Sequence, residues 1–249
     1  MPRAIVSFVF VLVVGAAPLS SQTHIWADSS GYPLIHITAG YSLNSRNAEK
    51  ANMDFHKQEN LVEANQFTLR SNVVEPTTEY LVTVSVRPEG DHKILNLRIG
   101  EIRNSFRFTT TMSTILPDGT PAGSMVVVSE EQYQVIPVSI GASVSTIPPL
   151  LHVYADAIYA WATMTEVQSY SLNDGPSIPL TSSTFTSASG GFRIGGGITF
   201  SFTKRTAIVL DLGYRGLGFY SFYRENGSSS GLDYTISGMY GMIGLSFGL

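Results

Sequence analysis

The amino-acid sequence predicts an all-β protein, an eight-stranded antiparallel up-and-down transmembrane β-barrel with four long external loops. Three observations support this fold class. Apolar residues alternate with small or polar residues over long stretches, which is typical of β-strands and not of helices. Charged residues make up only 14 % of the chain, against roughly 25 % in ordinary soluble domains. Finally, short and long links alternate between the strand-like stretches.

The composition excludes several classes of protein. Hydrophobic residues make up 43 % of the 249 residues, which is too many for an intrinsically disordered chain. The formal net charge of −4 argues against a basic nucleic-acid-binding protein, so we expect no nucleic-acid partner. The chain has no cysteine, which excludes disulfide scaffolds, cysteine nucleophiles, thiolate metal sites and lipid attachment to a cysteine.

Residues 1–21 have the pattern of a secretory signal peptide. Arg3 supplies a positive charge, and Ala4 to Ala17 forms an apolar run that is too short for a membrane-spanning helix of about 20 residues. Small residues follow this run and suit a cleavage site near residues 20–22. An uncleaved anchor is the alternative. The sequence therefore predicts an exported chain with one β-barrel domain over residues 22–249.

Eight stretches alternate strongly enough to be predicted as strands. They are residues 34–43, 80–86, 93–108, 132–144, 151–165, 192–202, 208–215 and 239–249. In the third stretch the apolar phase changes, because Leu97 and Ile99 occupy odd positions whereas Ile102 occupies an even one. A β-bulge near Gly100–Glu101 would reconcile the two phases.

The links between these strands fall into two groups. The short links are residues 87–92, 145–149 and 203–206, and the long links are residues 44–78, 109–131, 166–189 and 224–232. Because neighbouring strands are antiparallel, all short links lie at one end, which is the layout of short periplasmic turns and long external loops. A two-residue turn at Lys204–Arg205 would place Arg193 and Arg215 on the face of their neighbours' apolar residues. We therefore predict a three-residue turn or a bulge there.

The last residues of the chain carry a family resemblance. Gly244–Leu245–Ser246–Phe247–Gly248–Leu249 resembles the closing strand of small outer-membrane barrels of the OmpA-transmembrane-domain and OmpX type, as do the segments Val135–Val138 and Thr203–Arg215. The resemblance implies that the barrel-assembly machinery recognises the terminal strand, with Phe247 in the signal position and Leu249 where the family has an aromatic residue. It also implies a monomer in the bacterial outer membrane, in contact with lipid and lipopolysaccharide. No peptidoglycan-binding domain is expected after the last strand.

Several charged residues are predicted to point into the barrel. They are Arg193, Asp211, Arg215, Asp156 and Glu101. An eight-stranded barrel is just wide enough to be filled by side chains, and an isolated buried charge is very costly. We therefore expect structural charge pairs in the lumen, with Asp211 pairing with Arg193 or Arg215. A proton or ion path is the alternative role for these groups.

Sites for chemistry are scarce. The segment Gly227–Gly231 matches the pattern G-x-S-x-G, but it lies in a Ser/Gly link and no histidine follows His152, so we interpret it as a loop. The five histidines lie in separate elements without metal-ligand spacing, and His36 and His152 are expected to point inward. We accordingly predict no catalytic residue, no metal site and no cofactor.

The role predicted for the chain is structural or adhesive and is carried by the external loops. Tyr159, Trp161, Tyr214 and Tyr234 are expected to form aromatic girdles at the membrane interfaces. Three alternatives remain: a small pore, a lipid-modifying outer-membrane enzyme, and a soluble lipocalin-like barrel that binds an apolar ligand. The last would show the same alternation with inside and outside exchanged, which periodicity cannot distinguish.

Overall fold

The computed structural model describes residues 35–44, 67–74, 77–87, 93–115, 121–147, 151–173, 175–224, 226–229 and 234–249. The predicted signal peptide lies outside these residues. The strands are β1 (Ile35–Asn44), β2 (Phe67–Val74), β3 (Thr77–Val86), β4 (Lys93–Ile115), β5 (Pro121–Ile147), β6 (Leu151–Leu172), β7 (Ile178–Ser201), β8 (Thr206–Phe219), β9 (Tyr234–Thr235) and β10 (Gly238–Gly248). Among the described residues there is no helix that is long and apolar enough to cross a membrane.

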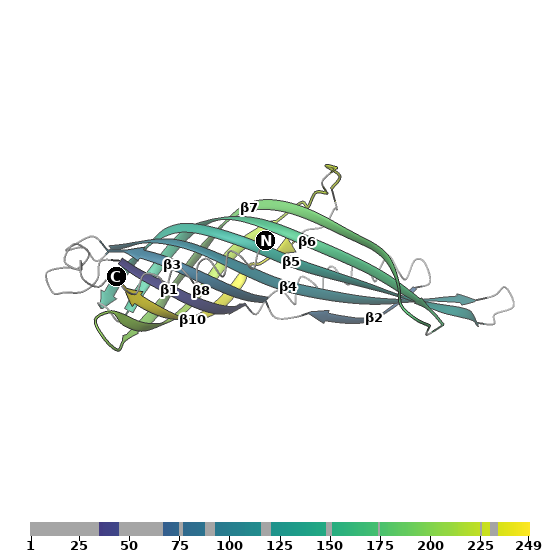
Figure 1. The fold of residues 1–249 in the computed structure, drawn as a ribbon, viewed down its shortest axis with the longest axis horizontal. Helices are drawn as coiled ribbons and strands as arrows, with labels where there is room; N and C mark the ends of the chain where they lie inside the picture. Colours follow the sequence, from purple (N-terminus) through teal and green to yellow (C-terminus); the bar gives the residue numbers. More distant parts are fainter. Residues whose placement is uncertain are drawn as a thin grey trace.

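Eight of these strands form a closed antiparallel barrel (Figure 1). The order around the ring is β10-β1-β3-β4-β5-β6-β7-β8, and β8 pairs with β10 to close it. The first strand therefore lies beside the last, with Ile37 opposite Phe247. The eight-stranded barrel predicted from the sequence is confirmed.

Strand β2 continues β3 along the edge of β4. Both pair antiparallel with β4, with Val74 opposite Phe106 and Thr78 opposite Arg103. The residue numbers of these pairs add up to 180 and 181, so the register shifts by one residue between the two strands. Pro76, in the dipeptide between them, has no N–H to donate to a ladder. The predicted long link over residues 44–78 therefore contains a strand that the sequence pattern did not reveal.

Four strands are much longer than the other four. Strands β4 to β7 have 22 to 27 residues, whereas β1, β3, β8 and β10 have 10 to 14. The long strands extend beyond the ring as an open sheet (Figure 1). The predicted loops 109–131 and 166–189 are therefore largely wrong, because most of their residues are paired in this sheet. Their many Thr and Val residues favour strands even without a clear apolar alternation.

The ladder along β4 is regular where a bulge was predicted. Ile99 lies opposite Val138 and Ile102 opposite Val135, and both pairs of numbers add up to 237, so the prediction of a bulge is wrong. Side chains at even positions of β4 point inward from Asn96 to Phe106, since Arg98, Ile102 and Phe106 are buried whereas Ile99, Arg103 and Arg107 are exposed. Glu101 therefore lies on the outer face, in contrast to the prediction. It is buried there because Arg103 and Gln134 cover it and donate to its carboxylate. The direction of the side chains does not change along this part of β4, but the outer face changes from apolar to polar and the inner face from polar to largely apolar.

The turn between β7 and β8 keeps the polar faces of the two strands together. Arg193 lies opposite Arg215, and the Phe202 N–H donates to the Thr206 carbonyl at 2.9 Å around the three residues 203–205. The Thr203 hydroxyl oxygen accepts bonds from the N–H groups of Arg205 at 3.1 Å and Thr206 at 3.0 Å. The predicted three-residue turn is confirmed.

Candidate functional site: the filled lumen and the external sheet

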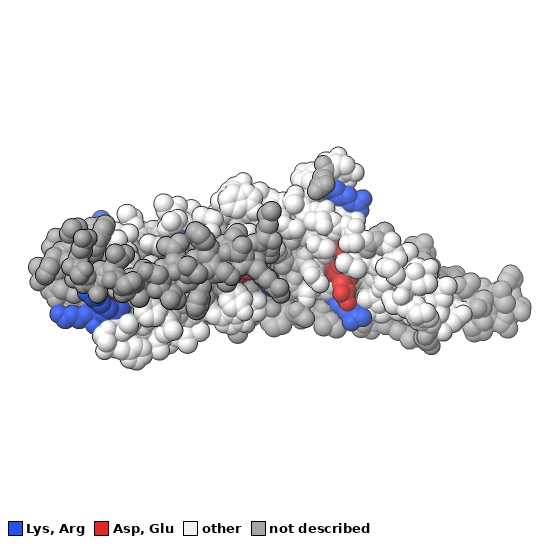
Figure 2. All heavy atoms as spheres, in the orientation of Figure 1, with Lys and Arg blue, Asp and Glu red and all other residues white. Residues whose placement is uncertain are grey.

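The outer surface of the ring is apolar. The exposed side chains of this apolar belt include Leu95, Leu97, Ile140, Val153, Phe192, Ile194, Leu212, Ile243, Leu245 and Phe247. Ile140 and Leu212 are 68 % and 70 % exposed, which a protein surrounded by water avoids over so large an area. Figure 2 shows cationic side chains at one end and mixed acidic and basic side chains further along, with uncharged described surface between them.

The belt ends at one row of paired residues. The last row of the belt contains Glu101, Ile136 and Trp161 on the outer face of β4, β5 and β6. Two residues further along each strand, towards the external end, the outward-facing residues are Arg103, Gln134, Thr163 and Thr186. Beyond this second row the outward residues are mainly polar, as in the exposed ion pair between Arg107 and Glu130 at 3.4 Å. We use the name external sheet for β2 together with the part of β4 to β7 that runs from the row of Arg103 to the external end.

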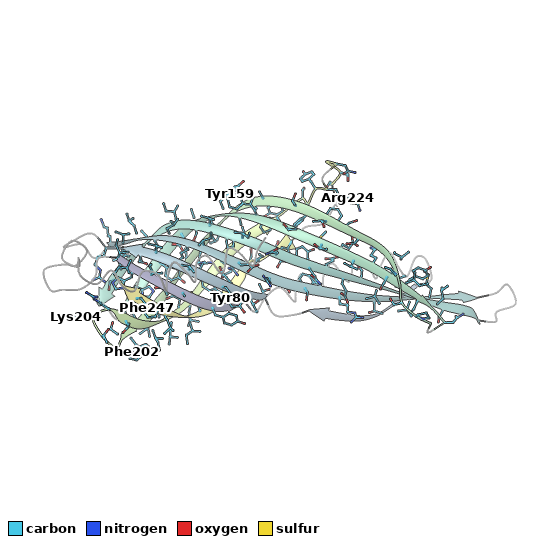
Figure 3. The ribbon with its side chains drawn as sticks, in the orientation of Figure 1. Tyr80, Tyr159, Phe202, Lys204, Arg224 and Phe247 are labelled. Carbon is cyan, nitrogen blue, oxygen red and sulfur yellow. The ribbon has the colours of Figure 1, made fainter. Side chains whose placement is uncertain are left out.

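Aromatic side chains lie at the boundary of the belt. Tyr159 and Trp161 are each 51 % exposed and pack edge to face with ring centroids 4.8 Å apart. Tyr214 also faces outward, and Figure 3 shows Tyr80 and Tyr159 projecting from the barrel wall. Tyr234 was predicted to join this girdle, but it is buried. Tyr234 lies at the end of the long link after β8, and its ring stacks on Tyr133 inside the barrel.

The lumen inside the belt is filled with charged side chains. Arg193 and Arg215 are almost completely buried, and both donate to the Glu79 carboxylate, at 2.7 and 2.6 Å. The predicted strand began at Tyr80, one residue too late to include this acid. Extending the alternation of Leu81 and Thr83 back by one step would have placed Glu79 on the inner face.

Asp211 bonds a histidine and neither of the two arginines predicted for it. Its carboxylate lies 2.9 Å from His152 Nε2. The reason lies in Gly197, which is paired with His152 on one side and with Asp211 on the other. A Cβ atom on Gly197 would collide with both side chains, so the glycine leaves the space in which they meet. Arg193 and Arg215 lie four residues further along their strands.

Glycines also allow two tyrosines to meet across the lumen next to the pair of His152 and Asp211. The hydroxyls of Tyr154 and Tyr240 are hydrogen-bonded although β7 and β8 separate their strands. The positions between them are Gly195 and Gly213, which are paired with each other and with the two tyrosines. Because neither glycine has a side chain, the two phenol rings cross the lumen. Arg98 lies over the Tyr154 ring at 4.5 Å from its centroid.

The described lumen charges balance within the belt. Arg98 is paired with Asp156, Arg193 and Arg215 share Glu79, and Asp211 is bonded to His152. Three arginines therefore face three carboxylates. Removing one member of this network would leave an unmatched buried charge and would destabilise the fold. These side chains fill the barrel at the level where a lipid bilayer would surround it.

The lumen becomes largely apolar where the external sheet begins, although Asn104 and Glu131 are also buried at this level. Ile102, Phe106, Tyr133 and Phe222 belong to one buried cluster. Tyr133 and Tyr234 stack with centroids 4.0 Å apart, and Phe222 packs edge to face against Tyr133 at 5.8 Å. Phe222 and Tyr234 come from the link after β8, which folds back into the barrel mouth. The external end is thus closed by an aromatic core.

The same link forms a projecting hairpin beside β7. The N–H and carbonyl groups of Tyr223 each bond Thr186 at 2.9 Å, and Arg224 N–H donates to the Ser228 carbonyl at 2.9 Å. Tyr220 is 78 % exposed, and Arg224 projects from the wall (Figure 3). Ser229, the serine of the G-x-S-x-G pattern, pairs with Tyr223 in this hairpin and does not follow a strand-to-helix turn. Among the described residues no group of three or more His, Cys, Asp or Glu side chains could hold a metal ion.

The chain shows only a distant likeness to proteins of known structure. No protein-family model and no curated protein matches it. It is similar to Ail, the attachment invasion locus protein of Yersinia pestis, in complex with the heparin analogue sucrose octasulfate, at 12 % identity, with 86 % of this chain and 96 % of that chain covered and a TM-score of 0.35. It is also similar to the outer membrane protease OmpT from Escherichia coli, at 12 % identity, with 74 % and 68 % covered and a TM-score of 0.33. Likeness at these TM-scores carries no argument about function.

Proposed function

We propose that this chain is an integral β-barrel of the bacterial outer membrane whose external sheet makes adhesive contacts at the cell surface. The observation that supports this proposal is the reversal of polarity along β4 to β7. Below the row of Arg103 these strands present apolar side chains outward and charges inward, which suits lipid. Above it the outward side chains are mainly polar, although Val167, Ile178 and Leu180 are exposed there too, and an apolar cluster lies inside, which suits water.

The external sheet is built as a rigid contact surface. Its strands remain paired up to Ile115 on β4 and Leu172 on β6, and β2 covers the β4 edge. Ordered strands lose less conformational entropy on binding than flexible loops do, so a preformed surface favours recognition. In the projecting hairpin, exposed Tyr220 and Tyr223, with Ser229 paired to Tyr223, add side chains that are common in protein recognition surfaces.

The three other roles have less support. A lipocalin-like barrel needs an apolar interior for its ligand, but the lumen within the belt contains Arg193, Arg215 and Glu79. A pore needs an open bore, whereas ion pairs and the aromatic core fill this one. For a lipid-modifying enzyme we identify no supporting arrangement of a nucleophile, a base and an acid among the described residues. The proposed partners at the membrane are lipid, lipopolysaccharide and the barrel-assembly machinery.

The proposal is tested by shortening the external sheet without disturbing the ring. Residues 110–127 and 167–182 are each replaced by Asn-Gly, which joins the paired residues Thr109 and Val128, and Glu166 and Ser183, by a two-residue hairpin turn. Bacteria producing the shortened chain should lose attachment to cultured epithelial cells. Outer-membrane fractionation and the mobility difference between boiled and unboiled samples should persist. Unchanged attachment by the correctly inserted, shortened barrel would contradict the adhesive role.

A further inference from the structure

The tip of the projecting hairpin has a chemically reactive sequence. Its turn contains Asn226–Gly227, the one Asn-Gly pair in the 249 residues of the chain. Both residues are exposed, and a Cβ atom on Gly227 would meet no atom within 4 Å beyond its chain neighbours. Because glycine has no side chain, the peptide nitrogen that follows the asparagine is open to approach. The asparagine side chain is therefore placed where it can react with the next peptide group.

The turn has the geometry of a three-residue hairpin loop. The Gly227 N–H donates to the Arg224 carbonyl, and the Arg224 N–H donates to the Ser228 carbonyl, both at 2.9 Å. Gly227 has a positive φ of 80°, which suits the last residue of such a loop. Tyr223 joins the hairpin to Thr186 on β7. The reactive pair thus lies at the tip of a hairpin that is anchored to the external sheet.

Ser228 holds the side chain of Asn226. Its N–H and its hydroxyl both donate to Asn226 Oδ1, at 3.0 and 2.7 Å. The first of these bonds forms an Asx turn, which folds the Asn226 side chain back along the peptide group that follows it. The same two donors would stabilise negative charge on Oδ1 during an attack on the amide carbon, as the donors of an oxyanion hole do.

We propose that Asn226 is a site of spontaneous deamidation, which changes the charge of the projecting hairpin. The Gly227 nitrogen attacks Asn226 Cγ when its hydrogen bond to the Arg224 carbonyl opens. The new N–Cγ bond closes a succinimide ring, and the side-chain nitrogen leaves as ammonia with the proton of the Gly227 N–H. One water molecule then opens the ring at either carbonyl carbon and gives aspartate or its β-linked isomer. The net reaction consumes water and releases ammonia, so it needs no other reactant.

The modification alters the hairpin in two ways. Both products replace a neutral amide by a carboxylate, two residues from Arg224. The β-linked product also adds one carbon to the backbone of the turn, so the hydrogen bonds that Gly227 and Ser228 make in the turn cannot all be retained. The chemistry of the site does not depend on the adhesive role, and its test has a readout other than attachment.

Peptide mapping of the full chain by mass spectrometry, in a nonionic detergent, tests the site. After several days at mildly alkaline pH, the peptide that contains Asn226 should gain the mass difference between NH₂ and OH and should separate into two products by chromatography. Asn173 is a control in the same chain. It is also exposed, and its Oδ1 accepts the Ser124 N–H at 2.9 Å, but an aspartate follows it in place of a glycine. Asn173 should be converted at least tenfold more slowly. An unchanged Asn226, or equal conversion of Asn226 and Asn173, would overturn the proposal.

Two variants separate the contributions of Gly227 and Ser228. Gly227→Asn adds a side chain beside the attacking nitrogen, and asparagine tolerates a positive φ, so the turn should persist while conversion of Asn226 slows at least tenfold. Ser228→Ala removes the hydroxyl donor but keeps the N–H donor, and it should slow the conversion several-fold. Undiminished conversion in Gly227→Asn would contradict the attack by the Gly227 nitrogen. Undiminished conversion in Ser228→Ala would contradict the contribution of the Ser228 hydroxyl.

Discussion

The belt and the external sheet are built from the same four strands, yet their polarity is opposite. On β4, Leu97 faces outward and Arg98 inward within the belt, whereas Arg103 faces outward and Ile102 inward at the start of the external sheet. The backbone register is continuous between them. The reversal shows that an apolar alternation locates a strand but does not tell which face is inside. Under the proposed membrane location, a change of apolar phase without a bulge marks the level at which the surroundings change from lipid to water.

Loss of the terminal strand's last residues should have the largest effect on this arrangement. Phe247 pairs with Ile37 on β1 and with Thr206 on β8, so deleting Phe247–Leu249 shortens both seams that close the ring. Open strand edges are not tolerated in lipid. The truncated chain should be exported but should accumulate in the periplasm instead of the outer membrane. A truncated chain that is still protease-resistant in the outer membrane would contradict the closure described here.

Breaking the central ion pair should have the next largest effect. Glu79→Leu leaves Arg193 and Arg215 without their shared carboxylate in the lumen, at an expected cost of about 3–5 kcal/mol of unfolding free energy. Glu130→Leu removes an exposed partner of Arg107 in the external sheet and should cost about 0–1 kcal/mol. Urea unfolding of both variants in lipid vesicles measures the difference. Equal losses would show that the lumen is as hydrated as the outer surface.

A smaller effect is expected at Asp211. Its bonded partner is an imidazole, which also exists as an uncharged ring, whereas the two arginines that share Glu79 keep their charge. Asp211→Leu should therefore lower the free energy of unfolding by about 1–3 kcal/mol, which is the cost of an unsatisfied buried polar group. The same unfolding assay measures it. If the loss matched that of Glu79→Leu, Asp211 would have to neutralise an arginine after all.

Ion conduction should be essentially absent. The ion pairs fill the belt region, and the aromatic core around Tyr133 and Tyr234 closes the external end. Protein reconstituted in a planar bilayer should show no steady conductance of porin size. A large, ohmic channel would be incompatible with a filled lumen.

The sequence predicted best those features that depend on neighbouring residues. The alternation in 192–202, 208–215 and 239–249 predicted three strands of the ring, and the parity of the turn at Lys204–Arg205 predicted its three residues. Both follow from the period of two along a strand. The inward direction of Arg193 and Arg215 followed from the same argument.

The features that the sequence did not reveal depend on distant residues or on a change of solvent. His152 meets Asp211 only because Gly197 lies between them in the folded sheet. The strands of the external sheet were interpreted as loops because Thr and Ser occupy an outer face that meets water. Tyr234 looked like an interface residue, since its link gives no sign that it returns to the barrel mouth. The missing information was which residues become neighbours in the fold and which faces of the strands meet water.

The most direct test of the reversed polarity compares two lysine substitutions on one face of β7. Ile194 lies in the belt and Thr184 in the external sheet, and both side chains are exposed on the outer face. Ile194→Lys places a charge in lipid and should lower the free energy of unfolding in phospholipid vesicles by about 2–4 kcal/mol. Thr184→Lys should change it by less than about 0.5 kcal/mol, as surface substitutions in water do. Equal effects at the two positions would contradict the assignment of the belt to lipid and of the external sheet to water.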